Sequence, residues 1–257
     1  MADSKPVRIY NIDTEEYKLY KEMHKKQTLE LVVQKKKEYS ELNKSKMTMK
    51  HALSLLNEFV DPSDPDIDVT NITHAYQTAE RIRKKYPDNK EYQLLGLIHD
   101  IGKVLYTFGE PSWAVVGDSY VLGCEFPQSI VFYDTLKDSP DYKKYDKLGI
   151  YTNGCGMENL HLSFGHDEYL YMVLSGNTHN FSKQYIDIIR YHSLYPWHTE
   201  GEYGEFMNDN DRQIFIDMMD FNQFDLYSKF DKIVIDDSIV DYYNALLDEY
   251  FPMELNW

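Results

Sequence analysis

Six histidine and aspartate residues are spaced along the chain in a pattern that could bind metal ions. His99 and Asp100 interrupt an apolar run at residues 94–101, where an unpaired buried carboxylate would cost several kcal/mol. The other candidates are His74, His166, His192 and Asp225. Imidazole and carboxylate ligands suit iron, manganese or zinc, and this set is large enough for two metal ions that share one carboxylate. A bound cation would explain why the His-Asp pair is tolerated.

Lys103 adds a cation to the same stretch. It follows His99 and Asp100 by about one helical turn, so we expect its side chain to reach the same cavity. An ammonium group there would favour a deprotonated substrate oxygen and would donate hydrogen bonds to a polyol. Asp100 and Lys103 are therefore the catalytic candidates.

Helices must position these side chains, because hydrophobic periodicity near 3.6 residues dominates the chain. One helix is expected to begin after Thr70, a favourable N-cap residue, and to end before Pro87. The expected helices are residues 14–40, 47–60, 71–86, 90–106, 165–175, 182–193, 210–219 and 239–250. Residues 109–160 are glycine-rich and irregular, with a short hairpin or loop at 112–124. The expected fold class is all-α, in a single domain over residues 1–257.

Composition restricts the class of protein and its partners. The chain has 257 residues, 42% of them apolar, and a net charge of −16. An acidic surface disfavours nucleic acid and anionic membranes as partners, and no apolar run is long enough to span a bilayer. Two cysteines and an N-terminus without an apolar signal segment indicate a cytoplasmic protein. We expect a monomer.

The order of the ligand candidates resembles that of a known superfamily. A histidine, an adjacent His-Asp pair and a late aspartate, here His74, His99, Asp100 and Asp225, are similar to the pattern of the HD superfamily. Members of that superfamily are helical and bind one or two metal ions. The short motif alone is only moderately specific.

Longer phrases resemble one family within this group, the myo-inositol oxygenases. The matching phrases are "DPSDPDIDVTNITHAYQTAERIRK" (61–84), "LLGLIHDIGKVLYTFGEPSWAVVGDSYVLGC" (94–124), "SFGHDEYLYMVL" (163–174), "RYHSLYPWHT" (190–199) and "FDLYSK" (224–229). This resemblance implies an HD-type core at about residues 45–250. It also implies opening of the myo-inositol ring by O2 to give D-glucuronate and water, at a mixed-valent Fe(II)/Fe(III) centre.

The resemblance also assigns roles to individual residues. His74, His99, Asp100 and Asp225 would hold one iron, and Asp100 would bridge to a second iron held by His166 and His192. The implied substrate contacts are Arg8, Asp61, Pro62, Ser63, Lys103, Gly117, Asp118, His192 and Ser193. Carboxylates at Asp61 and Asp118 could accept hydrogen bonds from hydroxyl groups, and Gly117 would let the backbone approach a ligand closely.

Two other functions remain open on the sequence. An HD-type phosphohydrolase would use the same four ligands and a metal-bound hydroxide, but Lys103 is the chief cation available for a phosphate. A metal- or inositol-binding sensor would bind metal and inositol at these residues but would form no product. The N-terminal helical segment, to about residue 40, could serve as a lid because it is rich in charge and separate from the motifs.

Overall fold

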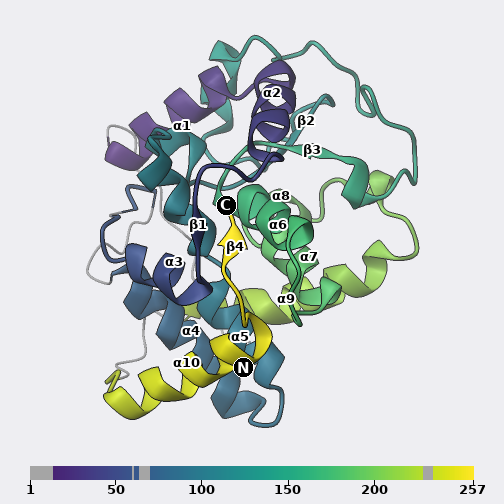
Figure 1. Ribbon diagram of the computed structural model, residues 1–257. Helices are drawn as coiled ribbons and strands as arrows, with labels where there is room; N and C mark the ends of the chain where they lie inside the picture. The colour runs from purple at the N-terminus through teal and green to yellow at the C-terminus, as the bar shows by residue number, and fades with distance from the viewer. Residues whose placement is uncertain (1–13, 60, 64–69, 228–233) are drawn as a thin grey trace.

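The helical architecture that the periodicity predicts is observed (Figure 1). The computed structural model describes residues 14–59, 61–63, 70–227 and 234–257. The α-helices are α1 (Glu15–Lys26), α2 (Leu29–Tyr39), α3 (Met49–Leu55), α4 (Asn71–Lys85), α5 (Lys90–Ile98), α6 (His166–Gly176), α7 (Lys183–Tyr191), α8 (Tyr195–His198), α9 (Asp211–Tyr227) and α10 (Asp237–Tyr250). No helix in the described part of the chain has the length and apolar character needed to cross a membrane.

Short 3₁₀ helices and two-residue strands connect the α-helices. The 3₁₀ helices are η1 (Ile101–Phe108), η2 (Ser112–Ala114), η3 (Tyr133–Asp138), η4 (Met157–Asn159) and η5 (Gly204–Phe206). The strands are β1 (Lys46–Met47), β2 (Val121–Leu122), β3 (His161–Leu162) and β4 (Leu255–Asn256). Most of the 3₁₀ turns lie between residues 109 and 160, which confirms the irregular middle of the chain.

One cluster of buried side chains extends through the described residues, from α1 to β4. Helix α4 packs on α5, α6 packs on both α7 and η1, and α7 packs on α9. In Figure 1, α3, α4, α5 and α10 lie together in the lower half, with α6 and α7 beside the chain's C-terminus. The helices that carry the ligand candidates therefore share one core.

The strands differ from the hairpin that the sequence suggested at residues 112–124. Residues 112–114 form η2, and β2 pairs antiparallel with β3, about 40 residues later in the chain. The other small sheet pairs β1 with β4, at the opposite ends of the sequence. Of the two expectations for residues 112–124, the hairpin was wrong and the loop agrees better with the structure, because the short strand β2 pairs with a distant segment.

The expected helix at residues 90–106 is broken where the motif lies. Helix α5 ends at Ile98, η1 begins at Ile101, and His99 and Asp100 occupy the junction between them. Asp100 has backbone dihedral angles of −94° and −2°, close to the sparsely allowed bridge region in which many active-site residues lie. The break gives the two side chains directions that a continuous helix would not allow.

The N-terminal segment is two helices rather than one, and it is not separate from the core. Thr28 caps the N-terminus of α2 through its hydroxyl and divides α2 from α1. From α1, Tyr20, Met23 and His24 are all buried. The charge-rich sequence of this segment did not indicate that α1 is packed into the core, and its role as a lid stays a prediction.

Candidate metal centre

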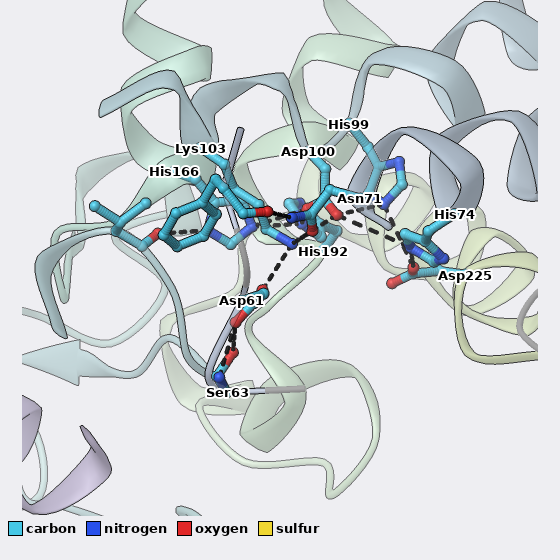
Figure 2. Close-up of polar contacts among 12 residues, drawn as sticks. Asp61, Ser63, Asn71, His74, His99, Asp100, Lys103, His166, His192 and Asp225 are labelled. Carbon is cyan, nitrogen blue, oxygen red and sulfur yellow. Dashed lines mark hydrogen bonds and ion pairs between the residues drawn. The ribbon is translucent and has the colours of Figure 1, made fainter. Parts of the chain in front are cut away.

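The six candidate ligands come from five separate parts of the fold and meet at one place (Figure 2). His74 lies in the middle of α4, and His99 and Asp100 lie between α5 and η1. His166 is the first residue of α6 and His192 directly follows α7, while Asp225 lies near the end of α9. All six are at most 8% exposed. The sequence pattern thus corresponds to a single buried cluster.

Asp100 stands between two groups of histidines, and each of its oxygens faces a different group. Its Oδ1 lies 3.2 Å from His166 Nε2 and 3.5 Å from His192 Nε2. Its Oδ2 lies 3.6 Å from His99 Nε2 and 3.9 Å from His74 Nε2. Two compact sets of donor atoms result, one with His74 and His99 and one with His166 and His192, and either could hold a metal ion.

The His166–His192 pair shows a direct need for a cation. His166 Nδ1 lies 2.8 Å from the carbonyl oxygen of Val115, and His192 Nδ1 lies 2.6 Å from that of Ile189. These carbonyls place the ring hydrogens on Nδ1, so a lone pair remains on each Nε2. The two Nε2 atoms are nevertheless only 3.1 Å apart. A cation beside both atoms, either a proton or a metal ion, would relieve this repulsion.

The half of the cluster formed by His74, His99 and Asp225 also brings metal-ligand atoms close together. His99 Nδ1 lies 2.9 Å from the carbonyl oxygen of Gly96, and its buried Nε2 has no hydrogen-bond partner among the described residues. Asp225 Oδ1 lies 3.0 Å from His74 Nε2 and 3.4 Å from His99 Nε2. A carboxylate and two imidazole nitrogens therefore converge, as in metal sites whose histidines are oriented by backbone carbonyls.

Electrostatics keep both aspartates of the cluster ionised. Burial alone would raise the pKa of Asp100, but Lys103 and His99 outweigh burial and hold that pKa well below its ordinary value. Burial would likewise raise the pKa of Asp225, but the adjacent imidazoles of His74 and His99 outweigh burial and hold that pKa well below its ordinary value. Both groups are therefore available as anionic ligands at neutral pH.

Lys103 is buried in η1 and its ammonium group has three acceptors. Nζ lies 2.8 Å from Asp100 Oδ2, 2.8 Å from Asp61 Oδ2 and 3.1 Å from Asn71 Oδ1. Burial alone would lower the pKa of Lys103, but the two carboxylates outweigh it and raise that pKa, so the lysine stays charged. Asn71 was not recognised in the sequence, where an asparagine in the first turn of a helix carries no distinctive signal.

A cavity adjoins the cluster and is lined by residues of both histidine groups, by Lys103 and by most of the predicted substrate contacts. Its lining includes Asp61, Ser63, Gly117, Asp118 and Ser193 together with every ligand candidate except His99. It also includes Tyr195 and Leu226, which the sequence reasoning missed although both lie in phrases that carry the resemblance. Pro62 is not among the lining residues, and Arg8 lies outside the described residues.

Helix α1 contacts the loop that contains Asp118, one of the residues that line the cavity. The Tyr20 hydroxyl donates a hydrogen bond to Asp118 Oδ1 at 3.0 Å and accepts one from the Asp118 backbone N–H at 2.9 Å. Gly117 has a φ of +108°, and a Cβ there would lie 2.9 Å from Met23 Sδ. Glycine is therefore required at position 117 by backbone conformation and by the approach of α1.

Gly102 allows α6 to reach the cluster, and replacing it should damage the site. A Cβ at position 102 would lie 1.9 Å from the carbonyl oxygen of His166. Because backbone must then move, we expect Gly102→Ala to lower the free energy of unfolding by about 1–3 kcal/mol or more, in urea denaturation. Gly204→Ala is the control, since a Cβ there meets nothing within 4 Å. Equal stability of both variants would contradict this close approach.

Comparison with known proteins agrees with the cluster and the cavity. The family model for myo-inositol oxygenase matches residues 14–257. Inositol oxygenase of Mus musculus is 43% identical over 242 residues, covering 93% of this chain and 85% of that protein. Inositol oxygenase of Dictyostelium discoideum is 45% identical over 247 residues, with the same coverage of 93% and 85%. Inositol oxygenase 1 of Arabidopsis thaliana is 45% identical over 244 residues, 93% of this chain and 78% of that protein. The chain belongs to the myo-inositol oxygenase family.

Proposed function

We propose that this enzyme opens the ring of myo-inositol with O2 to give D-glucuronate and water, at a centre of two non-haem iron ions. The observation that carries the proposal is the position of Asp100, whose two carboxylate oxygens face two different histidine groups. The buried core extends over the whole described chain, which supports action as one domain. We further propose that the protein is a cytoplasmic monomer.

The ligand assignment follows the two groups of donor atoms. His74, His99, Asp100 and Asp225 would hold one iron, and Asp100, His166 and His192 would hold the other. Mixed imidazole and carboxylate ligation suits iron and also leaves positions open for substrate and O2. When bound in the Fe(II)/Fe(III) state, the pair would supply Lewis acidity toward the polyol and activation of O2.

The protein's own residues would bind and orient the polyol. The Lys103 ammonium lies at the boundary between the cluster and the cavity, where it would stabilise a deprotonated substrate oxygen. Asp61 and Asp118 would accept hydrogen bonds from ring hydroxyls, and Ser63 and Ser193 would add further polar contacts. Leu226 would contribute an apolar wall that limits access of water.

An oxygen-electrode assay with product detection tests the proposal. Purified protein loaded with ferrous iron, in the presence of cysteine and myo-inositol, should consume one O2 per D-glucuronate formed. Iron analysis of the same sample should give two ions per chain. Release of phosphate from phosphate esters without O2 consumption would identify a phosphohydrolase instead. Iron and inositol binding without glucuronate would identify a sensor.

A further inference from the structure

A buried ion pair between Glu168 and Arg190 joins the ends of α6 and α7 that carry His166 and His192. Glu168 lies two residues after His166, and Arg190 lies two residues before His192. Arg190 Nε lies 2.8 Å from Glu168 Oε2, and Arg190 Nη2 lies 3.3 Å from Glu168 Oε1. Glu168 is 0% exposed and Arg190 is 1% exposed. Neither residue lines the cavity, so neither is accounted for by the proposed substrate contacts.

The arginine makes a complete set of hydrogen bonds, and this fixes its orientation. Besides the two bonds to Glu168, Nη1 donates to the carbonyl oxygen of Glu158 at 3.1 Å and to the hydroxyl of Tyr191 at 3.2 Å. Nη2 donates to the carbonyl oxygen of Leu160 at 3.1 Å. All five guanidinium hydrogens are thereby used. Arg190 therefore connects α7 to α6 and also to the segment that leads through β3 toward His166.

A third charged residue joins the pair from the N-terminal part of the chain. Lys36 of α2 places Nζ 2.6 Å from Glu168 Oε1, with its side chain 26% exposed. Glu168 is therefore held by cations from two helices. A buried ion pair contributes little to net stability compared with well-packed apolar side chains. Stability alone therefore gives a weak reason for three charged residues at this place.

We propose that Arg190 and Glu168 are positioning residues that set the spacing of His166 and His192 and so maintain the metal site formed by these histidines with Asp100. The two Nε2 atoms are 3.1 Å apart with both Nδ1 atoms committed to carbonyls. When neither a proton nor a metal ion lies between them, the two nitrogen lone pairs repel each other, and a fixed spacing of the two helix ends opposes their separation. The fork geometry of arginine can hold two helix ends in one arrangement, which lysine cannot do.

The inference rests on the proposed function, and it makes a selective prediction. Loss of the pair should weaken metal binding by His166 and His192 while leaving the site of His74, His99 and Asp225 unchanged. A purely structural role would instead lower stability and affect both sites alike. Residues that orient metal ligands typically change metal affinity by roughly 10- to 100-fold when they are mutated.

Anaerobic titration with ferrous iron in two variant backgrounds separates these outcomes. In a His74→Ala background, which retains the His166–His192 site, Arg190→Lys should weaken iron binding about tenfold or more. In a His192→Ala background, Arg190→Lys should not change iron binding. Melting temperatures measured without metal should be recorded for every variant. Equal effects in the two backgrounds, or no effect in either, would overturn the inference.

Two further variants keep the test decisive. Glu168→Gln replaces Arg190→Lys in the test if the arginine variant fails to fold. It retains the shape of the side chain, and it should weaken iron binding at the His166–His192 site by a smaller factor. Arg83→Lys is the control, because Arg83 forms an ion pair with Glu80 on α4 but lies outside both histidine groups. Iron binding should be unchanged in this control. A wild-type chain that binds no iron would refute the proposed function itself, whereas equal iron affinity at both sites in wild type and Arg190→Lys would refute only the inference.

Discussion

Asp100→Ala is expected to lose both iron ions and to lower the rate of glucuronate formation by more than about 100-fold. The physical reason is that its two oxygens are shared between the groups at 3.2–3.9 Å, so one substitution removes a ligand from both sites. Iron content by elemental analysis and O2 consumption measure the result. Asp100→Asn keeps the shape but loses the charge, and we expect the same direction of effect.

The matched control for Asp100 is another acidic residue on a helix that carries a ligand. Asp220 lies on α9, five residues before Asp225, and it accepts hydrogen bonds from Lys85, Tyr86 and Tyr92. Asp220→Asn should retain iron and activity even if its stability falls.

Retention of one iron by Asp100→Ala would show that the carboxylate does not bridge. Circular dichroism should verify that both variants are folded.

Lys103→Met should retain both irons and reduce kcat/KM by about 10²- to 10³-fold. The expected size is that of removing one preorganised donor from a site where negative charge develops. Methionine fills a similar volume, so the loss isolates the ammonium group that contacts Asp61, Asp100 and Asn71. Lys103→Ala should have the same effect. Steady-state O2 consumption against inositol concentration separates kcat from KM.

Asp100→Ala should lose both irons whereas Lys103→Met should retain them, so the two variants separate loss of metal from loss of catalysis. Lys85→Met is its control, since Lys85 pairs with Asp220 at 3.0 Å on the protein surface, away from the cavity. Full activity in Lys103→Met would exclude a catalytic role for the lysine. Loss of iron in that variant would show that its charge mainly holds Asp100 in place for the metals.

Several features of the fold followed from local sequence signals. Helix α4 begins after Thr70 and ends before Pro87, as predicted, because capping and the restriction before proline act within a few residues. Helices α6 and α10 also agree closely with the periodicity. The hairpin alternative at 112–124 was wrong because β2 pairs with the distant β3, and the continuous helix at 90–106 was wrong because α5 ends at Ile98.

The sequence by itself determined the ligand types, their order and the family phrases, because these are properties of residues and of their spacing. It could not determine how the ligands face one another. His74 and Asp225 are 151 residues apart, and their contact depends on how α4 packs near α9. The division of Asp100 between two histidine groups depends on the break after α5 and on the fit of Gly102 beneath His166. Only tertiary packing decides such orientations, because helical periodicity is a local signal and carries no information on the angle or register between helices.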